Sequence, residues 1–260
     1  MWEAIEFEKK DNGVAVITLN RPQALNSFNA ELCFETIKAC KMVAEDDDIK
    51  CLVITGAGKG FTSGGDIGVL AAMDTPAKAK ATYDVSTSVV QAVYDLEKPV
   101  IAAVNGPVAG AGTALMLACD LIVASENARL AFSFINIAFC PDSGCSYFLT
   151  RKVGYNKAAE IIFFGKTLNA EEGLQLGLVN TVVPAEEVLN EALNWAEKLA
   201  AGPGLALKMD KKLLRQAYSN DFYQQAELES MYQVLAWASD DFKEGTMAFV
   251  EKRKPNFKGK

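Results

Sequence analysis

Residues Pro99–Ser146 read PVIAAVNGPVAGAGTALMLACDLIVASENARLAFSFINIAFCPDSGCS, and this stretch decides the fold. Its apolar run Val100–Val104 predicts a buried strand. The glycine-rich turn Gly106–Gly112 leads into an apolar helical run at Thr113–Cys119, and Leu121–Ala124 predicts a second strand. The helix therefore begins at a glycine turn. Its unpaired N–H groups and partial positive charge can hold an anion, or a carbonyl oxygen that becomes one.

A single carboxylate follows this unit. An apolar segment breaks at Pro141-Asp142-Ser143-Gly144, and the neighbours of Asp142 include Phe134, Ile137 and Phe139. Aspartate is common in turns, so a purely structural role is one explanation. The other is a functional carboxylate in an apolar cleft, where burial raises the pKa and makes the group a better base. The local pattern leaves both open.

Outward from this unit, strands and helices are expected to alternate up to residue 183. Apolar patterns predict a hairpin around Asn12-Gly13. They also predict helices at residues 31–44, 76–96 and 155–164 and strands at residues 51–55 and 178–183. From Pro184 onward only helices are expected, with breaks near residues 202–204, 219–220 and 239. The sequence therefore predicts an α/β core over residues 1–183 and an all-helical region over residues 184–260. Glycine loops between strand and helix indicate a spiral of similar turns.

Composition excludes several functions. The chain of 260 residues carries a net charge of −7 and no histidine, so Ser-His-Asp triads and histidine-ligated zinc are impossible within it. The acidic charge argues against a nucleic-acid partner, and no apolar run has the length of about 18 residues that a membrane span needs. The six cysteines form no CxxC pair and the N-terminus lacks a signal pattern. We expect a cytoplasmic protein with reduced thiols and no metal site.

The glycine loops have more than one interpretation. Gly110-Ala-Gly112 lacks the final glycine and the later acidic residue of a dinucleotide fingerprint, and Gly56–Gly60 is followed by no Lys-Ser/Thr pair of a phosphate loop. Gly65 and Ala111 each follow a strand and precede a helical segment. Their N–H groups could converge on one oxygen as an oxyanion hole, or both loops could be ordinary tight turns.

Five motifs, in order along nearly the whole chain, carry a resemblance. They are LNRPQALN at 19–26, GFTSGGDI at 60–67, NGPVAGAG at 105–112, CDLIVA at 119–124 and AEEGLQLGLV at 170–179. Together they resemble the enoyl-CoA hydratase/isomerase (crotonase) superfamily. The resemblance implies a crotonase-like spiral of ββα turns with a helical C-terminal trimerisation region. It also implies acyl-CoA thioester substrates, no cofactor, and a homotrimer or dimer of trimers.

Site residues follow from the resemblance, position by position. It assigns the oxyanion hole to the N–H groups of Gly65 and Ala111. The positions that match the family's substrate and CoA contacts are Ala24, Ser63, Gly64, Gly65, Asp66, Ile67, Gly110 and Phe134. Phe249 and Lys252 match the segment that completes a neighbouring subunit's CoA site, although charge alone would favour a solvated basic helix end.

Departures from the family pattern point to the reaction. Family hydratases use two glutamates to activate water, and this chain has Ala114 and Phe134 at the matching positions. Asp142 lies in a context that resembles the 3-enoyl-CoA to 2-enoyl-CoA isomerases and the ring-opened phenylacetyl-CoA isomerase of the family. The expected function is therefore double-bond isomerisation, with Asp142 as the single acid/base. Hydration, a ring-type isomerisation, and a catalytically silent acyl-CoA-binding or scaffold protein remain the alternatives.

Overall fold

A hairpin opens the chain and supplies two strands of a six-stranded sheet. In the computed structural model, which describes residues 2–259, β1 (Ile5–Lys9) and β2 (Val14–Leu19) pair antiparallel, with Ile5 opposite Leu19. Their connection turns at Gly13, whose φ of +81° suits glycine. The predicted hairpin is confirmed.

The main sheet has the strand order β1-β2-β3-β4-β6-β9 and is parallel from β2 onward. Its further strands are β3 (Cys51–Gly56), β4 (Val100–Val104), β6 (Leu121–Ser125) and β9 (Thr181–Val183). All residues of β3 and β4 are buried, as expected for parallel strands covered on both faces. The strands at the centre of the sheet therefore read as continuous apolar runs.

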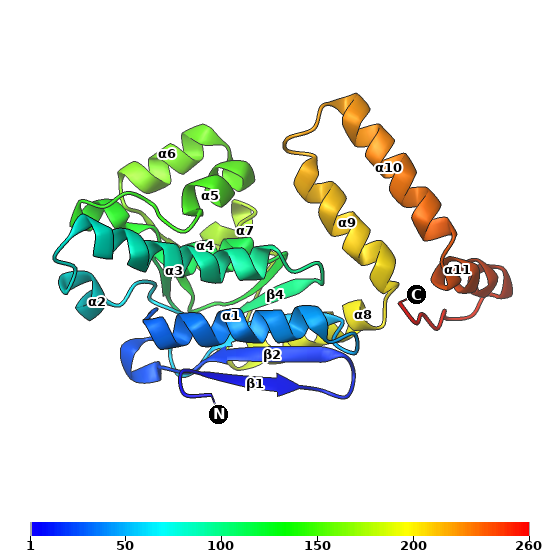
Figure 1. Ribbon diagram of the computed structural model, residues 1–260, viewed down its shortest axis with the longest axis horizontal. Helices are drawn as coiled ribbons and strands as arrows, with labels where there is room; N and C mark the ends of the chain where they lie inside the picture. The colour runs from blue at the N-terminus through cyan, green and yellow to red at the C-terminus, as the bar shows by residue number, and fades with distance from the viewer. Residues whose placement is uncertain (1, 260) are drawn as a thin grey trace.

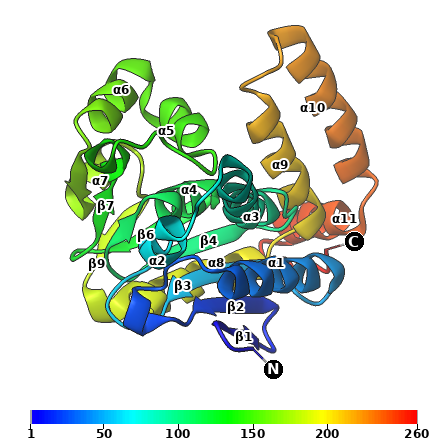
Figure 2. The same ribbon diagram turned by 60° about the vertical axis from the view of Figure 1, so that its left-hand side comes forward.

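Helices cover both faces of this sheet. On one face α1 (Ala30–Glu45) and α3 (Pro76–Tyr94) pack over the core that contains Ile17 and Ile54. On the other face α8 (Val188–Ala200) packs over Val16 and Val53. The alternation of these neighbouring strand residues between two cores is the period-two pattern of a strand. Figures 1 and 2 show α1 and α3 lying together on one side of the strands.

Three short strands form a second, smaller sheet. It contains β5 (Val108–Ala109), β7 (Arg129–Ala131) and β8 (Thr167–Asn169), and an isolated bridge joins Thr62 to Val108. These pairings stack successive turns of the chain on one another, which confirms the expected mixed α/β spiral. The remaining elements of the core are η1 (Pro22–Ala24), α2 (Ile67–Ala71), α4 (Ala111–Ala118), η2 (Ser133–Ile137), α5 (Cys145–Val153), α6 (Tyr155–Phe163), α7 (Ala170–Gln175) and η3 (Ala185–Glu187).

Three helices complete the chain: α9 (Gly204–Gln216), α10 (Phe222–Trp237) and α11 (Asp240–Glu251). Figure 1 shows α9 and α10 standing beside each other, away from the strands. No residue of α10 is buried. Helix α8 follows the expected boundary at residue 184 and packs on the sheet, where Val188, Ala192 and Ala196 belong to the core.

Several elements differ from the sequence-based prediction. Helix α4 begins at Ala111, two residues before the expected start at Thr113, and β9 covers only the last three residues of the run 178–183. The short strands β5, β7 and β8 and the helix α5 are additional elements. Five cysteines are buried and Cys140 is exposed. Among residues 2–259, no helix is long and apolar enough to cross a membrane.

Candidate active site

Two loops meet at one edge of the main sheet. They follow β3 and β4, which are adjacent and parallel, so both loops leave the same edge. A Cβ atom on Gly64 would lie 2.5 Å from the Ala109 carbonyl oxygen and 2.8 Å from the Ala111 nitrogen, and the φ of Gly64 is +78°. Only glycine permits this approach, so Gly64 is the residue that lets the two loops touch.

Each loop supplies one backbone N–H group to the space between them. The N–H of Phe28 donates to the Gly64 carbonyl (2.7 Å), and the N–H of Asp66 donates to the Phe28 carbonyl (3.2 Å). This pairing turns the Gly65 N–H to the opposite side, and it donates to no acceptor among residues 2–259. Ala111 is the first residue of α4, where N–H groups lack intrahelical partners. The two groups can converge on one oxygen.

A cavity of about 290 Å³ lies in front of these two donors. Most of the predicted site residues line it: Ser63, Gly65, Asp66, Ile67, Gly110, Ala111, Phe134 and Asp142. They come from the loop after β3, from the start of α4, from η2 and from the turn before α5. Residues that are up to 79 positions apart in the sequence, Ser63 and Asp142, therefore share one cavity.

Asp142 sits on a tight turn at the wall of this cavity. Ser143 and Gly144 both have positive φ angles (+51° and +84°), and the N–H of Cys145 donates to the Asp142 carbonyl at 2.8 Å as α5 begins. The carboxylate atom Oδ1 of Asp142 is buried and has no hydrogen-bond partner among the described residues. Burial raises the pKa of Asp142 above its usual value.

The second carboxylate of the lining, Asp66, is fully engaged. Its Oδ2 accepts hydrogen bonds from Ser27 Oγ (2.9 Å) and from the Arg21 guanidinium (3.2 Å), and its Oδ1 accepts one from the Gly68 N–H at 3.0 Å. The Ser27 and Arg21 bonds lower the pKa of Asp66. Of the two carboxylates in the lining, Asp142 is the one whose oxygen is free to take a proton.

The positions matched to the hydratase glutamates hold no acid. Ala114 is fully buried in α4. Phe134 lies in η2, is buried, and forms part of the cavity wall. Neither side chain can orient a water molecule by accepting a hydrogen bond from it.

Four predicted residues lie outside the lining of the cavity. Gly64 and Ala24 are adjacent to it: Gly64 packs against Ala111, and the Ala24 carbonyl accepts a hydrogen bond from Ser63 Oγ at 3.5 Å. Phe249 and Lys252 belong to α11 and its C-terminal cap, and Phe249 is 85% exposed. Figure 1 shows α11 and α2 at opposite ends of the molecule. A single chain does not bring these two residues to its own cavity.

Sequence reasoning missed the contribution of α3 to the cavity. Thr82, Tyr83 and Ser86 line it, although the sequence predicts only that α3 packs against the core through residues such as Val89 and Val93. That packing is confirmed, and the same helix presents a second, more polar face to the site. The signal was the three hydroxyl-bearing side chains grouped within about one turn of the helix, at positions that interrupt the apolar stripe.

Aromatic rings form much of the remaining wall. Phe28, Tyr83, Phe134 and Phe139 all line the cavity, and the rings of Tyr83 and Phe139 meet edge to face at 6.3 Å. Burial, and secondly the charge of Asp142, raise the pKa of Tyr83. The hydroxyl of Tyr83 therefore stays protonated at neutral pH near the carboxylate.

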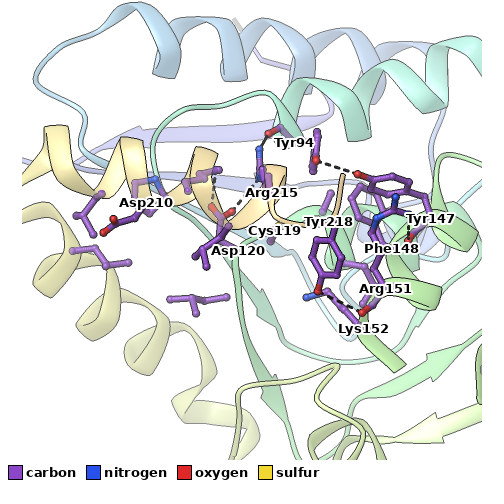
Figure 3. Close-up of a pocket in the computed structure, with 18 residues that line it drawn as sticks. Tyr94, Cys119, Asp120, Tyr147, Phe148, Arg151, Lys152, Asp210, Arg215 and Tyr218 are labelled. Atoms are coloured by element: carbon purple, nitrogen blue, oxygen red, sulfur yellow. Dashed lines mark hydrogen bonds and ion pairs between the residues drawn. The ribbon is translucent and has the colours of Figure 1, made fainter. Parts of the chain in front are cut away.

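A larger cavity of about 460 Å³ lies between α9 and the core. Figure 3 shows Asp120 and Arg215 joined in it by an ion pair (3.0 Å), with Tyr94, Tyr147 and Tyr218 around them. Acidic and basic side chains pair with one another there, and neither Gly65 nor Ala111 reaches this cavity. The free N–H groups of Gly65 and Ala111 and the buried carboxylate of Asp142 thus belong to the smaller cavity.

Known proteins match this chain over nearly its whole length. The family model described as "Enoyl-CoA hydratase/isomerase" matches residues 9–260. The chain is 37% identical to 1,2-epoxyphenylacetyl-CoA isomerase of Escherichia coli over 253 residues, covering 96% of this chain and 97% of the relative. It is 38% identical to 2,3-dehydroadipyl-CoA hydratase of the same organism over 249 residues, covering 95% and 96%.

Solved structures give the same result. The crystal structure of an enoyl-CoA hydratase from Bacillus anthracis superposes with a TM-score of 0.96 at 31% identity, covering 99% of this chain and all of the other. Relatives with isomerase names and relatives with hydratase names match over nearly the whole chain. Because the family model and these relatives match nearly its whole length, the chain belongs to the enoyl-CoA hydratase/isomerase family.

Proposed function

We propose that this protein is an acyl-CoA isomerase that converts a 3-enoyl-CoA into a 2-enoyl-CoA. The observation that carries the proposal is the unpartnered, buried Oδ1 of Asp142 in the cavity that also holds the free N–H groups of Gly65 and Ala111. A base and an oxyanion hole in one cavity are the two groups that enolate chemistry needs.

The proposed reaction moves one proton and no other atom. The thioester oxygen accepts hydrogen bonds from Gly65 and Ala111, which makes the protons on carbon 2 more acidic. The carboxylate of Asp142 removes one of them, and the electron pair spreads over the dienolate from the thioester oxygen to carbon 4. The protonated Asp142 then returns the proton to carbon 4, which restores the carbonyl and leaves the double bond between carbons 2 and 3. No metal or further cofactor takes part in these steps.

Phe134 and Ala114 favour isomerisation over hydration. Water addition needs a polar group that holds and deprotonates water. The family hydratases use glutamates for this, and the two apolar side chains occupy the matching positions in this chain. The proposed site instead shields the proton on Asp142 from solvent, so that the same proton returns to the substrate.

A ring-bearing acyl group is the second candidate substrate. The aromatic side chains of Phe28, Tyr83, Phe134 and Phe139 favour a flat ring, since aromatic pairs gain about 0.5–1.5 kcal/mol beyond the area they bury. The isomerase relative from Escherichia coli is named for an epoxyphenylacetyl substrate. The proton transfer would be the same for a cyclic unsaturated acyl group.

The assay that tests the proposal compares three substrates. A linear 3-enoyl-CoA, a cyclic unsaturated acyl-CoA and a 2-enoyl-CoA in water are followed by absorbance of the conjugated thioester and by mass. We expect isomerisation of the first or second and little hydration of the third. The Asp142→Asn variant should lose about 100- to 10,000-fold in turnover and still bind acyl-CoA. Efficient hydration by the wild type, or binding without turnover of any substrate, would overturn the proposal.

The proposed enzyme is a trimer, or a dimer of trimers, with CoA sites completed by Phe249 and Lys252 of a neighbour. The support is the exposure of α10 and α11, where Met231, Val234, Leu235 and Phe249 are all more than half exposed. The exposed Ile67 beside the cavity offers a further apolar contact for CoA.

Sedimentation velocity and CoA titration test this assembly. We expect a trimer mass or its double, and weaker CoA binding after Phe249→Ala. The control is Phe34→Ala, which removes an exposed ring from α1 and should leave CoA affinity unchanged. A monomer with full CoA affinity would contradict the proposed arrangement.

A further inference from the structure

Three side chains next to the oxyanion loop form a compact cluster that the proposed reaction does not use. Arg21 Nη1 lies 2.6 Å from the Ser27 carbonyl oxygen and 3.2 Å from Asp66 Oδ2, and Ser27 Oγ donates to the same Asp66 oxygen at 2.9 Å. The side chains of Arg21 and Asp66 are about one-fifth exposed (18% and 21%). The cluster is therefore mostly buried near the protein surface, and water screens its ion pair only in part.

Asp66 follows Gly65 directly in the chain, so the cluster is attached to one of the two proposed oxyanion donors. The Asp66 N–H donates to the Phe28 carbonyl (3.2 Å), and its Oδ1 accepts from the Gly68 N–H at 3.0 Å. With its Oδ2 held by Arg21 and Ser27, Asp66 is fixed through its backbone and through both carboxylate oxygens. Rotation of the peptide between Gly64 and Gly65, which aims the N–H, would strain these bonds.

The residues before Asp66 are held through their backbone alone, since the Gly64 carbonyl accepts from the Phe28 N–H at 2.7 Å. Gly64 has no side chain, and a Cβ atom on Gly65 would meet only the Leu70 side chain, at 3.6 Å. Neither glycine can therefore fix the direction of the Gly65 peptide through side-chain packing of its own. The side-chain restraint on the donor comes from the C-terminal side, through Asp66.

We propose that Asp66, held by Arg21 and Ser27, is a positioning residue that aims the Gly65 N–H at the thioester oxygen. This inference rests on the proposed function, because it concerns the oxyanion donor of that site. It gives the Asp66 side chain a role different from direct contact with CoA, since both of its oxygens are occupied within the protein. The side chain acts through Gly65 and touches no substrate atom.

The Asp66→Asn variant separates this role from helix capping. Asparagine keeps the size and can still accept from the Gly68 N–H, so the start of α2 is retained. It loses the charge that Arg21 requires and presents an NH₂ group or a neutral oxygen to the guanidinium. Arg21→Lys tests the same cluster from the other side, because a single ammonium group cannot reproduce the forked contacts with Ser27 and Asp66.

In these variants kcat should fall while KM stays nearly constant. Misplacement of a catalytic group by about 1 Å costs up to about 100-fold, so we expect kcat to fall about 10- to 100-fold while KM changes little. The matched control is Asp74→Asn, which removes an exposed carboxylate paired with Lys78 at 2.8 Å near α3. This control should leave kcat unchanged. Equal losses in kcat for Asp66→Asn and for the control would contradict a specific role.

The stretching frequency of the bound thioester carbonyl gives a direct readout of the donor. The probe is a saturated acyl-CoA labelled at the carbonyl carbon, which binds but cannot isomerise. Wild type and Asp142→Asn should both lower the frequency on binding, because the two N–H groups polarise the carbonyl. Asp66→Asn and Arg21→Lys should lose part of this shift while still binding the probe.

Each result of the carbonyl measurement decides the matter. A full shift in Asp66→Asn and Arg21→Lys would overturn the positioning role and leave the proposed reaction intact. No shift in the wild type would overturn both, because Gly65 would then be no oxyanion donor. A shift lost in the variants but kept in Asp142→Asn would support the positioning role whatever the reaction at carbon 4 proves to be.

Discussion

Asp142, as the proposed base, should give the reaction its pH dependence. Burial raises the pKa of Asp142, and a base acts only when it is deprotonated. We therefore expect kcat/KM to fall with decreasing pH along a limb that lies above the usual range of carboxyl groups. Rate measurements across pH with a 3-enoyl-CoA check this, and a limb at the ordinary carboxyl pKa would contradict it.

Burial of the Asp142 carboxylate also lowers the stability of the folded protein at neutral pH. A carboxyl whose pKa is raised by folding binds its proton more tightly in the folded state. Stability is then lost as pH rises from the ordinary carboxyl pKa through the raised one. Asp142→Asn should therefore raise the melting temperature at neutral pH and change it little in acid. Thermal melts of both proteins at the two pH values test this.

Gly64 sets the separation of the two loops that carry the proposed oxyanion donors. A Cβ atom at Gly64 would overlap the Ala109 carbonyl oxygen at 2.5 Å and force the loops apart. Gly64→Ala should therefore lower turnover by about 100-fold or more, the usual loss for one oxyanion donor. Gly154→Ala is the matched control, because Gly154 has nearly the same φ (+77° against +78°) and a methyl group there would meet nothing within 4 Å. The control measures the cost of positive φ alone, and an equal loss of turnover in both would contradict the steric explanation.

At the scale of elements, long periodic segments were predictable and short ones were not. The apolar stripe of α3 and the continuous apolar runs of β3 and β4 are local patterns, and the structure confirms them. β5 has only two residues, too few to show a period, and its partner β7 is set by tertiary contact. Helix α5 was missed although it carries end signals, with Arg151 and Lys152 in its last turn and Gly154 after it.

Some residues of the candidate site were predictable from the sequence and others were not. Family motifs led to Asp142, Gly65 and Ala111 by position, and the structure brings all three to one cavity. The pair Arg21–Asp66 spans 45 positions, and no local pattern links residues that far apart. The contribution of Tyr83 was missed for a related reason, since its ring meets that of Phe139, 56 positions further along the chain.

Asn26 joins the loop after β2 to the loop after β3. It is fully buried with a φ of +55°, and its Nδ2 donates to the carbonyls of Ala57 (2.9 Å), Gly60 (2.9 Å) and Phe61 (3.1 Å). Asn26→Asp keeps the shape but points a carboxylate oxygen at three carbonyl oxygens. We expect a loss of about 3 kcal/mol or more in the free energy of unfolding.

Denaturant titration measures the effect of Asn26→Asp. The exposed Asn190→Asp is the control, expected within about 0.5 kcal/mol of the wild type. If Asn26→Asp were as stable as this control, the buried amide would contribute nothing to loop closure.

At the scale of the whole molecule, one buried ion cluster joins the C-terminal helices to the sheet. Lys211 of α9 donates to Asp120 Oδ2 (2.6 Å) and to the Lys98 carbonyl (2.8 Å), and Arg215 pairs with Asp120 Oδ1 at 3.0 Å. The Lys211 side chain is only 7% exposed, and burial lowers its pKa. Figure 3 shows the Arg215 contact at the wall of the larger cavity.

Removal of Lys211 should loosen α9 from the core. Lys211→Met leaves the Lys98 carbonyl unpaired and Asp120 with one cation fewer, at a cost of about 1–3 kcal/mol. Lys208→Met removes the half-exposed ion pair with Glu97 on the same helix and should cost no more than about 1 kcal/mol. Hydrogen exchange should increase along α9 in Lys211→Met alone. Equal exchange in the two variants would contradict a special role for the buried cluster.

The two donors of the proposed oxyanion hole are main-chain groups, and this has a consequence for mutational tolerance. Every residue except proline carries an N–H, so substitution at Ala111 or Gly65 leaves the donor atom in place. The two departures from the hydratase pattern, Ala114 and Phe134, and the proposed base Asp142 lie on separate elements: α4, η2 and the turn before α5. The acid/base groups can therefore be exchanged one at a time while both proposed oxyanion donors are kept.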